Sequence, residues 1–106
     1  MTPRHGYAVD VDALSYNAAR FALSWAEGHR SQTANALKHR LKDAEARFQA
    51  RFWNERRGYL ADSHNGSHAD ESLRPNQLWA LALPYSPLTA AQRASCLEHV
   101  TRALLL

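Results

Sequence analysis

Apolar residues recur in steps of three and four along most of this 106-residue chain. That spacing places them on one side of a helix and predicts four helical segments. The first ends before Gly28, and the third begins near Pro75, a residue that helices tolerate in their first turn. The segments are expected at about 9–26, 31–53, 74–83 and 89–106.

The two longest segments have the clearest apolar faces. In the first, the face expected to pack into a core consists of Val11, Leu14, Ala18, Phe21, Ala22 and Trp25. In the second, it consists of Ala34, Leu37, Leu41, Ala44, Phe48 and Phe52. Core packing is the favoured role of all three tryptophans, and Trp79 is the one nearest to a polar cluster. Thr89 and Gln92 have the form of a capping box at the start of the fourth segment.

Between the second and third segments the helical pattern stops. Asn65-Gly66 is a turn signal, and residues 58–62 suit a short extended piece before it. The chain has no strong strand pattern, so we expect an all-α domain of two helical hairpins over residues 1–106. Residues 104–106 are all leucine and carry no capping signal, which favours a piece of a longer domain.

Charge and composition narrow the function classes. The chain has 13 Lys and Arg against 10 Asp and Glu, and the excess lies between Glu27 and Arg57, where basic residues are interleaved with acids. Such a mixed segment is typical of a solvated helix rather than of a nucleic-acid-binding face. No uncharged apolar run approaches the ~20 residues of a membrane span, and the first residues lack the apolar stretch of a signal peptide. We therefore expect neither nucleic-acid nor membrane partners. A single cysteine excludes an internal disulfide, and together with the missing signal peptide this favours a cytoplasmic protein.

Two stretches, 3–18 and 70–79, are rich in polar side chains around expected helix starts. Planar side chains with paired donors and acceptors suit neighbouring sugar hydroxyls, and an arginine fork suits a carboxylate or a cluster of oxygens. A simpler interpretation makes Asp70 or Ser72 a helix cap and Arg74 the ion partner, with Asn76 and Gln77 on the surface. Composition alone leaves both interpretations open.

Short motifs connect these two stretches across nearly the whole chain. They are Pro3-Arg4, Gly6, Ala13-Leu14, Tyr16-Asn17-Ala18, Phe52-Trp53-Asn54, Gly58-Tyr59-Leu60, Asp70 and Arg74-Pro75-Asn76-Gln77. In this order they resemble the C-terminal catalytic domain of glycogen debranching enzymes, the amylo-α-1,6-glucosidase family. Arg-Pro-Asn-Gln combined with Tyr-Asn-Ala is the most specific part of the resemblance. Two positions differ from the family pattern: Asp10 stands where the family usually has Glu, and Ser15 where it usually has Trp. Substrate binding through these two positions could therefore differ from that of the family.

The resemblance implies an (α/α)6 toroid, of which this chain would form about one third, and hydrolysis of α-1,6-linked glucose at glucan branch points. It places the general acid in a Trp-Met-Asp segment upstream of Pro3 and the partner carboxylate downstream of Leu106. This chain would then bind an α-glucan or oligosaccharide without supplying a catalytic residue, so an isolated chain is expected to be inactive. The substrate-binding residues implied by the resemblance are Arg4, Asp10, Tyr16, Asn17, Asp70, Arg74, Asn76 and Gln77.

Other interpretations stay open. The chain could belong to another (α/α)6 glycoside hydrolase, trehalase-like or glucosylglycerate-type. It could also be a non-catalytic helical module that binds sugar or protein and self-associates through unfinished barrel edges. A catalytic pair within the chain, Asp10 with Asp70, is a less favoured alternative. Asp62 and Glu71 are interpreted as loop or capping acids.

No metal or cofactor is expected. His64 and His68 share a loop with acidic residues, but neither a cysteine nor a rigid helix accompanies them, so exposed loop histidines are the favoured interpretation. Cys96 has only His99 as a potential activating neighbour in sequence, and a structural thiol is favoured there.

Overall fold

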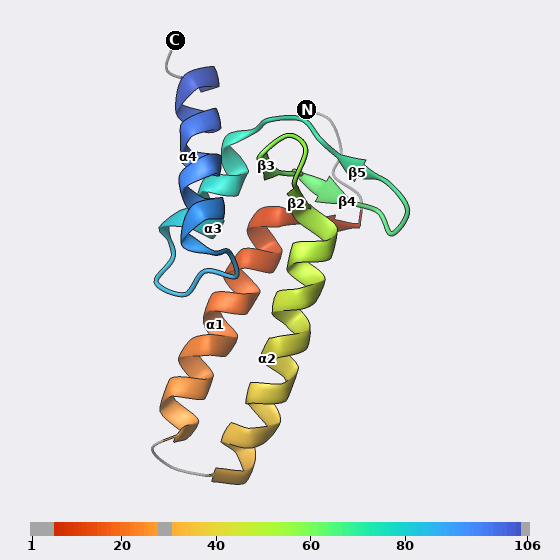
Figure 1. The fold of residues 1–106 in the computed structure, drawn as a ribbon. Helices are drawn as coiled ribbons and strands as arrows, with labels where there is room; N and C mark the ends of the chain where they lie inside the picture. The colour runs from red at the N-terminus through yellow and green to blue at the C-terminus, as the bar shows by residue number, and fades with distance from the viewer. Residues whose placement is uncertain (1–5, 28–30, 105–106) are drawn as a thin grey trace.

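The computed structural model describes residues 6–27 and 31–104 and is predominantly helical (Figure 1). Two long antiparallel helices form a hairpin, and two shorter helices lie beside one end of it. The helices are α1 (Val9–Glu27), α2 (Ser31–Phe52), α3 (Leu78–Ala82) and α4 (Ala90–Leu104), with a 3-10 turn, η1 (Pro75–Gln77), before α3. The all-α class is confirmed, and the four predicted segments correspond to these helices.

The main core lies where the start of α1 meets the end of α2. Phe48 and Phe52 of α2 pack with their ring centroids 4.9 Å apart. They are buried together with Val9, Ala13, Leu60, Ala61, Ala80, Leu88 and Cys96. A second cluster lies between the two long helices, toward the end of α1 and the start of α2. It consists of Tyr16, Leu23, Ala26, Ala34 and Leu41. The apolar face predicted for α2 is therefore the face that packs.

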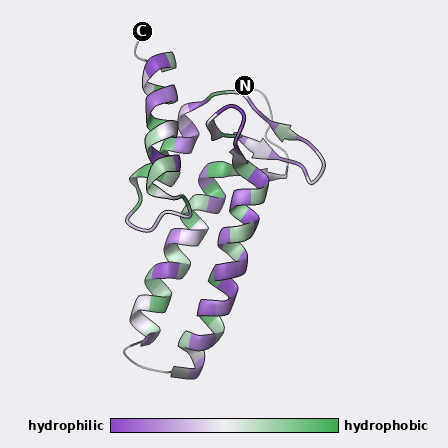
Figure 2. Ribbon diagram, in the orientation of Figure 1, coloured by the Kyte–Doolittle hydropathy of each residue, from purple (hydrophilic) through white to green (hydrophobic). Residues whose placement is uncertain are grey.

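The prediction of which side of α1 faces the core is wrong. Val11, Leu14, Phe21 and Trp25 are 55%, 42%, 51% and 68% exposed, and the two alanines between them are exposed as well. The buried residues of α1 are Val9, Ala13, Tyr16, Leu23 and Ala26. Apolar residues thus occupy two sides of α1, whereas much of α2 is hydrophilic (Figure 2). Periodicity finds an apolar face without identifying its partner, and here the side with Ala13, Tyr16 and Leu23 is the one that packs into the hairpin.

Two-residue strands organise the region between α2 and α3. A three-stranded antiparallel sheet has the order β1-β4-β5, and a separate pair joins β2 to β3. The strands are β1 (Tyr7–Ala8), β2 (Trp53–Asn54), β3 (Tyr59–Leu60), β4 (Ser63–His64) and β5 (Ala69–Asp70). The predicted extended piece becomes β3, and the predicted turn at Asn65-Gly66 connects β4 to β5. Asn65 Oδ1 accepts hydrogen bonds from the backbone of Ser67 and His68, which closes that turn.

A glutamine pair fastens α4 to α2. Thr89 and Gln92 form the predicted capping box, with Thr89 N donating to Gln92 Oε1 at 2.9 Å and Gln92 N to Thr89 Oγ1 at 3.1 Å. The side-chain amides of Gln92 and Gln49 each donate to the other's oxygen at 2.7 Å. Gln49 also donates to the carbonyl of Pro87 at 2.9 Å, so α2 holds both the cap and the loop before it.

The tryptophans divide between core and surface. Trp53 is partly buried against the main core, but Trp25 and Trp79 are 68% and 50% exposed, so the core role predicted for those two is wrong. Cys96 is fully buried among apolar residues, as a structural thiol should be. Burial raises the pKa of its thiol to about 11, which keeps the thiol protonated at neutral pH.

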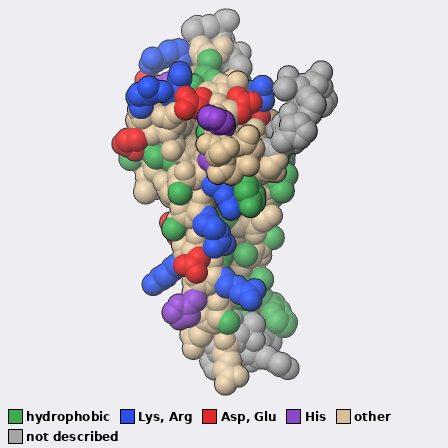
Figure 3. Space-filling view, turned by 90° about the vertical axis from the view of Figure 1, so that its right-hand side faces the viewer, with side chains coloured by type: hydrophobic (Ala, Val, Ile, Leu, Met, Phe, Trp, Pro, Cys, Tyr) green, Lys and Arg blue, Asp and Glu red, His purple; other side chains and the backbone are tan. Residues whose placement is uncertain are grey.

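The exposed side of the hairpin carries mixed charge. Figure 3 shows Lys and Arg side chains spread along the molecule with Asp and Glu between them. Lys38 approaches Glu27 at 3.6 Å, and Arg51 approaches Asp12 at 3.4 Å. The acids therefore neutralise part of the basic segment, as the sequence pattern indicates. Among the described residues, no helix has the length and hydropathy needed to cross a bilayer.

Glycine substitutions test the close approach of the β1 and β4 segments. Gly6 has φ +79°, and a Cβ there would lie 2.7 Å from Asn65 Cα and closer still to the His64 carbonyl oxygen. Gly66 has φ +100° with open space around it, so it provides a matched control. We expect Gly66→Ala to cost about 1–2 kcal/mol from backbone strain alone. Gly6→Ala should cost at least about 1 kcal/mol more because of the backbone clash. Urea unfolding measures both, and equal losses would contradict this packing.

Candidate functional site

Asp62 occupies the centre of a polar cluster beside the short sheet. It follows β3, and its backbone joins two segments: Val9 N donates to Asp62 O at 3.0 Å, and Asp62 N donates to Asp70 O at 2.8 Å. The residue is 1% exposed. A buried carboxylate requires charged or hydrogen-bonding partners, and the residues after β5 supply them.

Arg74 connects two carboxylates. Its Nη1 lies 2.7 Å from Asp62 Oδ2 and 3.2 Å from Asp70 Oδ2. The Asp62 side chain is fully buried, whereas those of Arg74 and Asp70 are 33% and 34% exposed. The cluster therefore has an inner anchor, Asp62, and an outer edge formed by Arg74 and Asp70.

The two amides after Arg74 support the same loop. Asn76 Nδ2 donates to Asp62 Oδ1 at 3.0 Å, so both Asp62 oxygens accept hydrogen bonds. Gln77 is 1% exposed; its Oε1 accepts from Leu60 N at 3.1 Å, and its Nε2 donates to Arg74 O at 3.2 Å. Asn76 and Gln77 therefore fasten the Arg-Pro-Asn-Gln segment to the end of β3. Gln77 is a supporting residue inside the loop and does not lie on the surface.

A second group of contacts borders this cluster. Tyr59 donates its hydroxyl to the carbonyl of Glu71 at 3.0 Å. The Glu71 carboxylate pairs with Arg57 Nε at 2.7 Å and with Arg56 Nη2 at 3.8 Å. Glu71 thus links the β2–β3 turn to the loop after β5. The sequence interpretation of Glu71 as a loop acid agrees with this position.

The contacts within the cluster favour the ionised forms of Asp70 and Arg74. Hydrogen bonds from the side chain and backbone of Ser72, together with the charge of Arg74, lower the pKa of Asp70 below its ordinary value. The hydrogen bond to Asp62 is the main cause that raises the pKa of Arg74. At neutral pH the outer edge therefore presents an ionised carboxylate beside a permanent cation.

This geometry is suited to binding and is a poor arrangement for general acid catalysis. A glycosidase needs one carboxyl group that holds a proton, and a lowered pKa disfavours that role for Asp70. Asp62 is buried, and the Arg74 guanidinium lies between the two carboxylates, where a scissile bond would need space. The exposed edge can instead accept and donate hydrogen bonds with vicinal hydroxyls.

The remaining residues implied by the resemblance are distributed around the first helix. Asp10 is half-buried in the first turn of α1, next to the Val9 amide that donates to Asp62. Tyr16 is buried between α1 and α2, and Asn17 Oδ1 accepts from Tyr85 N at 3.0 Å, which anchors the loop after α3. Arg4 lies outside the described residues. Within the described residues, no hydrogen bond or ion pair joins Tyr16 or Asn17 to the Arg74 cluster.

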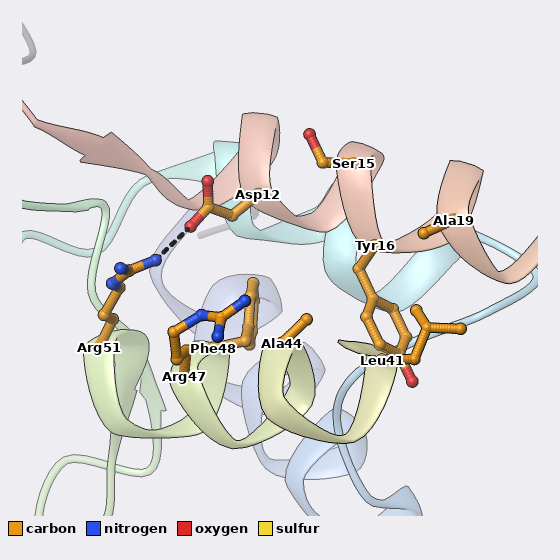
Figure 4. Close-up of a pocket in the computed structure, with 9 residues that line it drawn as sticks. All are labelled: Asp12, Ser15, Tyr16, Ala19, Leu41, Ala44, Arg47, Phe48 and Arg51. Carbon is orange, nitrogen blue, oxygen red and sulfur yellow. Dashed lines mark hydrogen bonds and ion pairs between the residues drawn. The ribbon is translucent and has the colours of Figure 1, made fainter. Parts of the chain in front are cut away.

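Tyr16 instead lines a groove of about 210 Å³ between the two long helices (Figure 4). Its floor consists of Ala19, Leu41, Ala44 and Phe48 together with the Tyr16 ring, and its polar rim consists of Asp12, Ser15, Arg47 and Arg51. Arg51 pairs with Asp12 across the groove and lies 3.5 Å above the centre of the Tyr7 ring. Burial raises the pKa of Asp12, and the Arg51 charge opposes that shift.

Asp62 is the functional residue that sequence reasoning missed. It lies in a loop, as expected, but it is the most buried acid of the cluster and the strongest partner of Arg74. Strand alternation could not have identified it, because Leu60, Ala61 and Asp62 are all buried and β3 ends at Leu60. The one available signal is that an acid lies next to an apolar segment, where a buried carboxylate requires a partner such as Arg74.

The two loop histidines have separate surroundings. His64 is half-buried and accepts a hydrogen bond at Nδ1 from Gly66 N at 2.9 Å, and His68 is exposed. Within residues 6–27 and 31–104, no three His, Cys, Asp or Glu side chains come together in a geometry that would hold a metal ion.

Comparison with known proteins gives one family. Residues 1–106, the whole chain, match the model of a family described as Amylo-alpha-1,6-glucosidase. Searches of curated proteins and of solved structures gave no significant match. The matched range contains every motif on which the sequence resemblance rests.

The buried amide of Gln77 provides a first test of the site's construction. Gln77→Met keeps the side-chain length but leaves the Leu60 amide and the Arg74 carbonyl without their partner. We expect a loss of about 1–3 kcal/mol in the free energy of unfolding. Gln32→Met, at an exposed position of α2, is the matched control and should change little. A similar small effect for both variants in urea unfolding would show that Gln77 does not support the loop.

The lowered pKa of Asp70 gives a pH-dependent test. Its ionised form stabilises the folded chain at pH values above the unfolded pKa of about 4, and this contribution is lost as the pH falls through the lower folded value. The stability difference between wild type and Asp70→Asn should therefore shrink between about pH 5 and pH 2. A constant difference for Asp70→Asn would contradict the described hydrogen bonds.

Proposed function

Because this chain belongs to the amylo-alpha-1,6-glucosidase family, we propose that it forms part of a domain that hydrolyses α-1,6-linked glucose at glucan branch points. Its contribution is a substrate-binding edge formed by Asp70 and Arg74. The observation that carries the proposal is the anchoring of Arg74 by the buried Asp62, while the side chains of Arg74 and Asp70 stay 33% and 34% exposed.

This edge suits a sugar rather than a simple ion. A charged donor and a charged acceptor lie side by side, so the pair can engage two adjacent hydroxyls, one by donation and one by acceptance. A simple anion would meet the Asp70 charge, and a simple cation would meet Arg74. A neutral polyol avoids both repulsions.

The chain supplies binding and orientation while the catalytic carboxylates lie elsewhere in the complete domain. The arrangement of Asp62, Arg74 and Asp70 supports this division, because Arg74 separates the two carboxylates and Asp70 is held ionised. In the proposed (α/α)6 barrel, the four helices form about one third of the ring. The sheet and the Arg-Pro-Asn-Gln segment then lie at the rim of the sugar-binding cup.

An isolated chain should bind a branched oligosaccharide without hydrolysing it. The probe is panose, a trisaccharide that contains one α-1,6 linkage, and its binding is measured by calorimetry or by thermal stabilisation. We expect Asp70→Asn and Arg74→Lys each to weaken binding at least tenfold, because Asn lacks the acceptor's charge and Lys lacks the planar fork of donors. Arg93→Lys, at an exposed position of α4, should bind panose as the wild type does.

A parallel assay measures glucose released from a debranching limit dextrin. The proposal expects no release above background from the isolated chain. Robust turnover that Asp70→Asn abolishes would overturn the binding-only role of this chain. Panose binding that is unchanged in both site variants would overturn the assignment of the binding edge.

A further inference from the structure

The turn between β4 and β5 brings a histidine against the backbone nitrogen of its Asn-Gly pair. Gly66 N donates a hydrogen bond to His64 Nδ1 at 2.9 Å. The backbone of His64 is held on both sides, because it pairs with Tyr7 of β1 and with Ala69 of β5. Imidazole is the side chain best suited to accept a proton near neutral pH. His64 therefore has a fixed position from which it can take the proton of the Gly66 amide.

Three donors converge on the side-chain oxygen of Asn65. Its Oδ1 accepts hydrogen bonds from Ser67 N at 3.0 Å, from Ser67 Oγ at 3.2 Å and from His68 N at 2.7 Å. The Asn65 side chain thus folds forward over the Gly66 peptide. Donors at such distances stabilise the negative charge that forms on a carbonyl oxygen when its carbon is attacked. The turn therefore has the contacts of a small oxyanion hole.

We propose that Asn65 is a self-modification site, at which the turn promotes loss of the side-chain amide through attack by the Gly66 nitrogen. His64 Nδ1 accepts the proton of Gly66 N, and this nitrogen forms a bond to Asn65 Cγ. Negative charge develops on Oδ1, where the three donors bind it. The Cγ–Nδ2 bond then breaks, and the proton passes from His64 to the leaving nitrogen, which departs as ammonia. The product is a cyclic succinimide that joins residues 65 and 66.

Water completes the reaction. Residues 65–68 are exposed, so solvent reaches both carbonyl carbons of the succinimide. Hydrolysis at the side-chain carbon gives an aspartate at position 65. Hydrolysis at the backbone carbon gives an isoaspartate, whose main chain runs through the former side chain. The two steps consume water and release ammonia without any change of oxidation state.

Gly66 leaves the attacking nitrogen accessible. It has φ +100° with open space where a Cβ would lie, and glycine itself carries no side chain that could crowd its own nitrogen. The other asparagines of the chain all precede residues that have a Cβ, and they are Asn17, Asn35, Asn54 and Asn76. They provide internal controls for the reactivity of Asn65.

The modification acts on the hairpin that carries Asp70. Ser63 pairs with Asp70, and Asn65 N donates to His68 O across the turn at 3.0 Å. An aspartate at position 65 keeps the accepting oxygen and adds a negative charge. An isoaspartate lengthens the main chain by one methylene group and disrupts the closure of the turn. Accumulation of isoaspartate therefore loosens β5 and the Asp70 side of the cluster.

Peptide mapping of the full 106-residue chain by mass spectrometry tests the proposal, because each conversion of an amide to an acid is assigned to its asparagine. The chain is incubated in neutral buffer with and without denaturing guanidinium chloride. We expect position 65 to convert at least threefold faster in the folded chain, since unfolding separates His64 and the oxyanion donors from the reacting atoms. A folded-state rate equal to or below the denatured rate would overturn the proposal.

His64→Phe tests the base directly. Phenylalanine keeps the size of the ring but cannot take a proton, so we expect the folded-state rate at position 65 to fall at least fivefold and the denatured rate to stay unchanged. His68→Phe is the matched control, because it removes an exposed histidine from the same turn and keeps the backbone donor to Asn65 Oδ1. Equal rates in the two variants would overturn the assignment of His64. Both tests proceed without a sugar, so their outcome is independent of the proposed function.

Discussion

The buried carboxylate of Asp62 is the constraint on which the organisation of the site depends. A carboxylate removed from water is tolerated only when its charge and its lone pairs are matched by the protein. Here Arg74 supplies the charge, and Arg74 and Asn76 bind the two oxygens. The backbone of Asp62 meanwhile holds Val9 at the start of α1 and Asp70 at the end of β5. One residue therefore connects the first helix, the sheet and the Arg-Pro-Asn-Gln segment.

This constraint also explains how the exposed edge obtains its chemistry. Arg74 is a long, flexible side chain, and a free arginine would lose considerable conformational entropy on binding a sugar. Its salt bridge to Asp62 removes much of that freedom before any ligand arrives, and Gln77 fixes the backbone beneath it. Asp70 stays ionised beside it. The result is a preorganised donor and acceptor, which is the property that a substrate-binding wall needs.

The sequence predicted the helices well because each long segment repeats its apolar residues at helical spacing and has identifiable boundary residues. The capping box at Thr89 and the turn at Asn65-Gly66 are local signals of the same kind, and both are present in the structure. The packed side of α1 could not be predicted in the same way. The exposed side of α1 contains the large residues Phe21 and Trp25, and only the position of α2 decides which of the two apolar sides is buried.

The cluster around Asp62 illustrates a second limit of sequence reasoning. Motifs identified Asp70, Arg74, Asn76 and Gln77, but their division into an exposed edge and buried supports depends on contacts across 12 to 17 residues. The simpler interpretation was correct that Asp70 and Arg74 form an ion pair. It was wrong that Gln77 lies at the surface, because the glutamine replaces a backbone partner for Leu60.

Mapping panose onto the isotope-labelled chain by NMR tests the central claim most directly. The account predicts that panose shifts the Arg74 Nε–H signal and the backbone amides of residues 70–74. Signals along the α1–α2 groove, such as those of Leu41 and Ala44, should stay in place. Shifts confined to that groove, or an unchanged Arg74 signal at saturating panose, would contradict the proposal that the Asp62-anchored arginine forms the sugar-binding edge.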